Sequence, residues 1–166
     1  MSLPDWDNRP REEARLLNPA FVAALLWACA DGHGAETGTG LPYPLSFIGL
    51  TVVLHKPTRI TLPRSKRTSL AAWLGAHPRA LVGFSGRASA LVSIVKGGLL
   101  FGCREGLITM DHERIHAGPR PRSIASFERE TTDEVKDCLK RASFVGRWFA
   151  GAGQSGTVMA LWGVSP

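Results

Sequence analysis

The five residues HERIH, at positions 112–116, come nearest in type and spacing to a catalytic motif. They match the H-E-x-x-H pattern of zinc peptidases, in which one helix face presents two histidines to zinc and the glutamate activates a metal-bound water. The flanking sequence argues against a helix, because LITM at 107–110 favours a strand and Gly-Pro at 118–119 stops a helix. No later histidine supplies a third ligand. We interpret His112 and Glu113 as exposed residues of a hairpin turn and rank zinc hydrolysis last among the candidate functions.

Other catalytic signatures are missing from the sequence. It contains no G-x-S-x-G, no Walker A and no G-x-G-x-x-G pattern. GAGQSG at 151–156 is rich in glycine, but it lacks the lysine and the following helix that a phosphate-binding loop needs, so we interpret it as a flexible connection. We therefore expect a protein that is not an enzyme and that needs neither a cofactor nor a metal.

The segment HKPTRITLPRSKRTSL, residues 55–70, concentrates positive charge. It contains no acid, and its cations are Lys56, Arg59, Arg64, Lys66 and Arg67. Basic loops of this kind neutralise nucleic-acid phosphates, and an acidic protein surface would attract the same charges. A structural role in a solvated loop is the third interpretation. We take these cations as candidates for binding either a nucleic acid or an acidic partner.

FVGRWF, residues 144–149, places arginine beside large aromatic residues near the end of a predicted helix. Arginine and tryptophan are common anchors of protein interfaces. The candidate contacts with a partner are Arg147, Trp148, Phe149 and Trp162. Packing in the core is the role that we expect first for Trp148 and Phe149.

Helical elements must position these groups. Asn18-Pro19 is a favourable start for a buried helix that continues to residue 30, and four glycines then predict a loop to residue 40. The periodicity of the apolar segment 41–55 does not separate helix from strand. Further helices are predicted at 9–17, 70–76, 78–84, 87–104 and 132–148, with a docked apolar segment at the C-terminal end.

The central part of the chain has the element order of a winged helix. Three helices between residues 70 and 104 are followed directly by a hairpin of LITM, a polar turn and RIHA. We therefore predict a mainly α fold with a winged-helix-like core at about 68–118 and a small β-hairpin. Residues 1–8 are predicted to be a flexible N-terminus, and residues 9–166 a single mainly helical domain.

Composition restricts the class of protein. The chain has 166 residues, 44% of them hydrophobic and 20% charged, with a net charge of +6, which fits one folded domain with a basic surface. The N-terminal stretch is too polar for a signal peptide, and the apolar runs are too short to span a membrane. Cys29, Cys103 and Cys138 are widely spaced, and we expect buried reduced thiols. Together these features predict a cytoplasmic location and no membrane partner.

Several segments together resemble a known family. They are RPREEARLLNPAF at 9–21, LPYPLSF at 41–47, VVLHKPTRITLP at 52–63 followed by TSLAAWL, Gly83-Phe84 with Arg87, LLFGCREGLI at 99–108, and ASFVGRWFA with the terminal LWGVSP. This pattern, from Arg9 to Pro166, resembles the middle component of bacterial three-component ABC-ATPase systems, which are predicted conflict or anti-phage defence systems. None of its motifs is a catalytic signature.

The resemblance implies a non-catalytic adaptor that links an ABC or SMC-like ATPase subunit to an effector protein, with double-stranded DNA as an additional partner. A stand-alone winged-helix regulator that binds DNA is the alternative. The resemblance also divides the basic segment. HKPTRITLP follows the family pattern and is rich in proline, which predicts a fixed shape with Arg59 as a buried anchor. RSKR at 64–67 is then the part expected to be exposed and to contact the partner.

Overall fold

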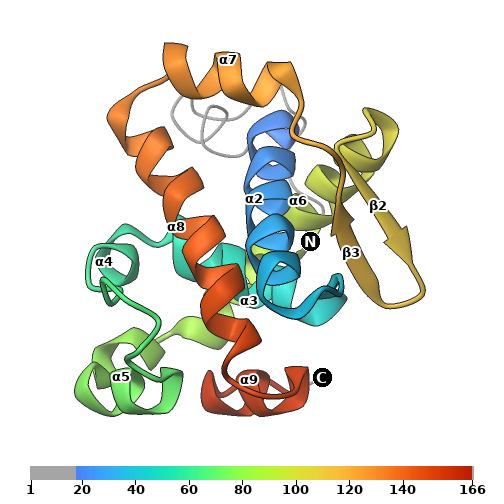
Figure 1. Ribbon diagram of the computed structural model, residues 1–166. Helices are drawn as coiled ribbons and strands as arrows, with labels where there is room; N and C mark the ends of the chain where they lie inside the picture. Colours follow the sequence, from blue (N-terminus) through green and yellow to red (C-terminus); the bar gives the residue numbers. More distant parts are fainter. Residues whose placement is uncertain (1–17, 166) are drawn as a thin grey trace.

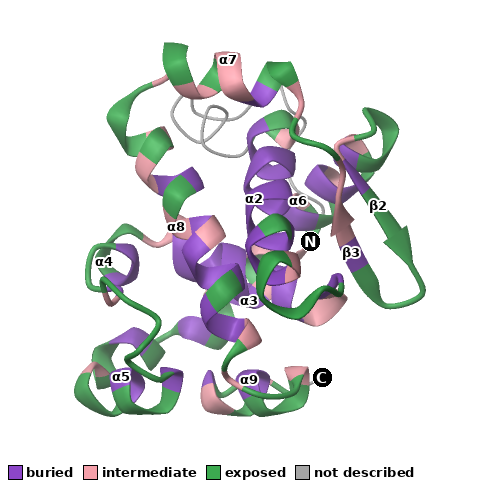
Figure 2. Ribbon diagram, viewed as in Figure 1, coloured by how far each residue is buried: buried purple, intermediate pink, exposed green. Residues whose placement is uncertain are grey.

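A computed structural model describes residues 18–165 and shows a mainly helical fold around one central helix (Figure 1). Helix α2, Pro19–Thr37, packs against α8, Asp133–Ala150, and against α6, Phe84–Arg104. Helix α3, Tyr43–Leu54, contacts all three. Every residue from Phe21 to Ala30 is buried, so α2 is enclosed by the other helices over most of its length (Figure 2).

The start of α2 is the predicted one, and its end is not. The Ala20 amide donates to the Asn18 side chain at 2.8 Å, and Pro19 occupies the first turn. The predicted loop at 31–40 is wrong in its first part, because α2 continues to Thr37 and ends at Gly38, whose φ of 68° suits glycine. Gly32 lies inside the helix, and the position requires glycine because a Cβ atom there would lie 2.2 Å from the Ser143 carbonyl oxygen of α8.

The segment that periodicity left ambiguous, 41–55, is mostly helix α3, which Pro44 opens within the first turn. The Ser69 hydroxyl accepts a hydrogen bond from the Ala72 amide at 3.2 Å and so caps helix α5, Leu70–Ala76. The predicted C-terminal apolar segment is docked, with Val158, Met159 and Trp162 buried. The short helices are α4, Lys56–Arg59; α5, Leu70–Ala76; the 3-10 helix η2, Pro78–Leu81; α7, Arg122–Glu130; and α9, Ser155–Leu161.

The predicted hairpin is confirmed, and it belongs to a three-stranded antiparallel sheet. Strands β2, Ile108–Asp111, and β3, Arg114–Ala117, pair with each other, and β1, Leu41–Pro42, pairs with the other edge of β3, giving the order β1-β3-β2. Ile108 and Ile115 are fully buried and attach the hairpin to the core. Strand β1 was not predicted, because two residues carry no periodicity.

The mainly α class is confirmed, whereas the winged-helix arrangement predicted for 68–118 is not. The hairpin packs against α2 and α6, while α5 packs against η2 and α9. The three helices that precede the hairpin in sequence therefore do not all surround it in space. Helix α7 was not predicted either. The predicted flexible segment 1–8 and the whole of the predicted helix 9–17 lie outside the described residues.

The three cysteines differ in their surroundings, which corrects the expectation that all are buried. Cys29 and Cys138 are buried, and Cys103 is exposed. Burial raises the pKa of the Cys29 thiol to about 12 and also raises the pKa of Cys138. Cys103 was misassigned because its neighbours Phe101 and Gly102 are apolar, although its own side chain lies on the outer face of α6.

We therefore expect native protein to expose one rapidly reacting thiol. Titration with a chromogenic disulfide reagent should label Cys103 within minutes and leave Cys29 and Cys138 unlabelled until denaturant is added, because thiolate and access are both required. The Cys103→Ser variant should lose the rapid phase entirely. Rapid labelling of a second thiol in the native protein would contradict the described core.

Candidate basic interaction surface

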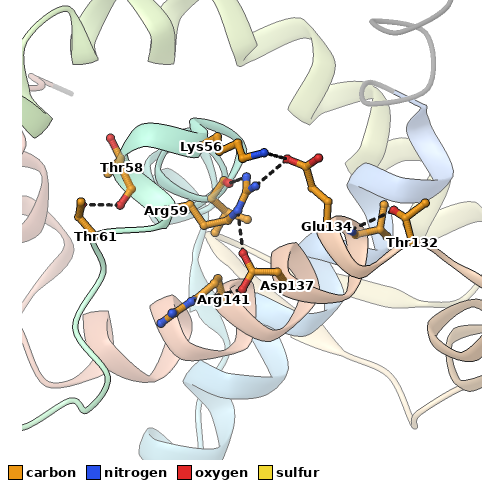
Figure 3. Close-up of polar contacts among 10 residues, drawn as sticks. Lys56, Thr58, Arg59, Thr61, Thr132, Glu134, Asp137 and Arg141 are labelled. Carbon is orange, nitrogen blue, oxygen red and sulfur yellow. Dashed lines mark hydrogen bonds and ion pairs between the residues drawn. The ribbon is translucent and has the colours of Figure 1, made fainter.

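Arg59 lies inside the fold and does not face a partner (Figure 3). Its side chain is 4% exposed. Its guanidinium donates to Asp137 Oδ2 at 3.0 Å, to Glu134 Oε1 at 2.9 Å and to the Val53 carbonyl at 2.8 Å. The predicted buried anchor is thus confirmed. Arg59 was also a candidate for binding a partner, and these internal acceptors occupy its guanidinium.

Lys56 extends the same ion-pair cluster toward the surface. Its ammonium lies 3.5 Å from Glu134 Oε1, and its side chain is 65% exposed. The hydrogen bond from Arg59, with the nearby charge of Lys56, holds the pKa of Glu134 below its usual value. Acids of the first turns of α8 therefore neutralise two of the five cations in the basic segment.

The remaining cations, Arg64, Lys66 and Arg67, lie on the loop between α4 and α5 and are exposed. Side chains from other elements hold the loop backbone. The indole of Trp73 donates to the Thr61 carbonyl at 2.9 Å, and the indole of Trp148 donates to the Thr68 carbonyl at 2.7 Å. These contacts at both ends give the loop a fixed shape, so its cations are presented from a rigid support.

Two shallow hollows lie along α8, and the first of them also reaches this loop. The first, of about 410 Å³, is lined by Lys66, Arg67 and Arg147, together with Glu36 at the end of α2. The second, of about 420 Å³, is also lined by Arg147 and includes Lys140. Arg147 therefore belongs to both hollows and connects the loop with the outer face of α8.

We call Lys66, Arg67, Lys140 and Arg147 the basic strip. Lys66 pairs with Glu36 at 2.5 Å. The other three form no ion pair with any residue between 18 and 165. Sequence reasoning found the loop but missed Lys140. The signal was available, because residues four and seven apart along a helix lie on one face.

The core packing that we expected first for Trp148 and Phe149 is confirmed, and Trp162, a candidate contact with a partner, is buried as well. Trp148, Phe149 and Trp162 are at most 2% exposed and belong to the core. Trp148 packs edge-on against Trp73 with ring centroids 5.5 Å apart, and Trp162 stacks on Phe84 at 4.4 Å. Arg147 alone of that group is exposed, because one residue along a helix rotates the side chain by about 100°.

The H-E-x-x-H segment forms the hairpin turn that the flanking residues predicted. His112 and Glu113 occupy the turn, and His116 lies on β3. The His116 ring and the Asp111 carboxylate approach to 2.8 Å. A strand and a turn do not place the two histidines on one helix face, and no group of three potential metal-ligating side chains occurs within the described part of the chain. The geometry of the zinc-peptidase motif is therefore not formed.

Comparison with known proteins identifies the family to which this chain belongs. A search of curated proteins and a search of solved structures each found no match. A family model described as MC3, ABC-three component (ABC-3C) system Middle Component 3, matches residues 6–166. That range includes the basic strip, the Arg59 cluster and the hairpin. The chain belongs to the Middle Component 3 family of ABC-three component systems.

Proposed function

We propose that the protein is a non-catalytic adaptor that links the ABC-ATPase subunit of its system to the effector. The basic strip is the surface that carries this proposal. It consists of exposed cations on a rigidly held loop and on a long core helix, and three of them lack a partner among residues 18–165. Such a surface attracts an acidic face of another component. It determines the orientation of the bound component more than the affinity of the complex. We assign this role in a cytoplasmic defence system.

Family membership supports the existence of partners, because a middle component belongs to a system of several components. The strip supports the kind of contact. Its aromatic neighbours are buried, so no exposed ring in it can stack on single-stranded bases. Two acids of α2, Asp31 and Glu36, also border the hollows and would repel a continuous phosphate backbone. These features favour an acidic protein surface over DNA as the main partner of the strip.

A DNA-binding winged-helix regulator remains the second candidate, and the order of elements favours it. The elements α2, β1, α3, α6, β2 and β3 succeed one another along the chain in the order of a winged helix. This holds if residues 55–83 are an insertion before the third helix, α6. Helix α6 would then read the DNA groove. Its outer face carries serine, glycine, alanine and leucine, with Lys96 and Arg104 as the only described exposed cations, which is poorly suited to base recognition.

Reversing two charges of the strip tests the proposal. We expect Arg67→Glu with Arg147→Glu to weaken binding to the ATPase or effector component by about tenfold or more at low salt, because like charges would then face each other. The difference should shrink as salt rises, because exposed charges are screened. Binding to the purified components is measured by biolayer interferometry, and binding to duplex DNA by fluorescence anisotropy over a salt series.

The control is the double variant Arg122→Glu with Arg129→Glu, which makes the same change in net charge on the exposed face of α7. It should bind like the unchanged protein. Failure to bind either component would refute the adaptor. Tight binding to duplex DNA alone, with a steep salt dependence that the strip variant removes, would establish the regulator instead.

A further inference from the structure

The outer face of helix α6 is largely exposed in the described part of the chain. The length of α6 corrects the expectation that every apolar run is too short to span a membrane, because this helix, alone among the described helices, has the length and apolar composition of a membrane span. Only 28% of its most apolar window is buried. Its inner face supplies Phe84, Val95 and Leu99 to the core. Leu100, with 75% exposure, is the most exposed large hydrophobic residue between positions 18 and 165. The outer face on its N-terminal side consists mainly of small residues: Ser85, Gly86, Ser89, Ala90, Ser93 and Gly97.

A groove of about 510 Å³ lies between α6, the start of α3 and the hairpin, and Leu100 forms part of its wall. Its lining is mostly apolar and includes Tyr43 and Met110, which is 42% exposed. Lys96 contributes a positive charge from the α6 wall, and Glu113 contributes a negative charge from the hairpin turn. Neither forms an ion pair with a residue of the described chain. An apolar groove with two unpaired opposite charges suits a protein partner.

We propose that this surface is a two-fold interface between two copies of this chain. An interface of this symmetry uses the same patch twice, so the patch must be complementary to itself. This one carries a protruding Leu100 next to a groove of matching apolar character. It also carries both charges, so that Lys96 of one copy pairs with the partner's Glu113 and the reverse pair forms at the same time. The small residues allow the two α6 helices to approach closely.

A second copy fits the patch better than an unrelated partner does. For a different protein, this surface would need to supply only a protruding side chain or a groove, and only one sign of charge. Here the protruding Leu100, the groove and both signs of charge lie together on one face. The surface is separate from the basic strip, which lies on α8 and the loop after α4. Self-association therefore stands or falls independently of the adaptor role.

The test is the oligomeric state of the full chain. Sedimentation velocity from about 1 to 100 µM should show a reversible monomer–dimer equilibrium. Leu100→Asp should raise the dimer dissociation constant by about 30-fold or more, the effect of removing a central hydrophobic anchor. Val82→Asp is the matched control, since Val82 is 70% exposed but precedes α6, and it should leave the dissociation constant unchanged.

Charge exchange tests the symmetry itself. Lys96→Glu and Glu113→Lys should each weaken the dimer by about tenfold, and the double variant should restore it, because both reciprocal pairs are re-formed with opposite signs. A chain that is monomeric at every concentration overturns the proposal. So does a dimer that survives Leu100→Asp, or one that the double charge exchange fails to restore. Binding of another component of the system through Leu100 by a monomeric chain would assign this face to that component.

Discussion

Gly146→Ala is expected to destabilise the protein by about 3 kcal/mol or more. A Cβ atom at this position would lie 2.0 Å from the Cys29 carbonyl oxygen and 3.0 Å from the His33 amide nitrogen. Both are backbone atoms of α2, so no side chain can rotate out of the way. The two helices would have to separate, and the close packing of the central helix would be lost along the contact.

Gly32 supports the same crossing from the other helix. Its Cβ would lie 2.2 Å from the Ser143 carbonyl oxygen, so Gly32→Ala should have an effect of similar size. Gly34→Ala is the matched control, because it lies on the same helix and its nearest neighbour, the Thr39 carbonyl oxygen, is 3.6 Å away. The control should be neutral or up to about 1 kcal/mol more stable, since alanine favours helix over glycine.

Equilibrium unfolding in urea measures all three variants, with circular dichroism as the signal. If the free energy of unfolding of Gly146→Ala lay within about 1 kcal/mol of that of the unchanged protein, the described approach of α2 and α8 would be wrong. The crossing also matters for function, because α8 carries Lys140 and Arg147 of the basic strip. Their position relative to Lys66 and Arg67 depends on how α8 lies against the centre of the fold.

Local signals explain which parts of the fold the sequence predicted well. The Asn18-Pro19 start and the hairpin turn both depend on neighbouring residues, and the structure contains both. Arg59 was predicted as an anchor because its segment follows the family pattern and is rich in proline, which indicates a fixed shape. An arginine in that setting needs internal acceptors, and the acids of α8 provide them.

The errors arise where contacts distant in sequence decide the outcome. The glycines after residue 30 predicted a loop by local preference, but α8 needs Gly32 as a helical residue at the crossing. Trp162 was a candidate contact with a partner, but it follows α9 into the core, where its ring lies 6.1 Å from that of Trp73 on α5. The full basic strip was not predictable from one segment, because the fold brings α8 beside the loop.

Arg59→Ala is the second change expected to have a large effect, a loss of about 3 kcal/mol in the free energy of unfolding. The substitution removes three hydrogen bonds and leaves the buried Val53 carbonyl without its donor. It also leaves Glu134 and Asp137 close together without the cation between them (Figure 3). Arg59→Lys should recover only part of the loss, since an ammonium group cannot reach three acceptors with the geometry of a guanidinium.

Lys56→Ala is the control for Arg59→Ala, because Lys56 contacts the same Glu134 from a largely exposed position. It should cost at most about 0.5 kcal/mol of the free energy of unfolding, as exposed ion pairs usually do.

The pH dependence of stability distinguishes Arg59→Ala from Lys56→Ala further. The hydrogen bond from Arg59 lowers the pKa of Glu134 in the folded chain, so its contribution to stability is present at neutral pH and is lost as the pH falls through that lowered pKa. The difference in stability between the unchanged protein and Arg59→Ala should therefore narrow in acid. Equal losses for Lys56→Ala and Arg59→Ala in urea unfolding at neutral pH would show that Arg59 is not the anchor of the loop.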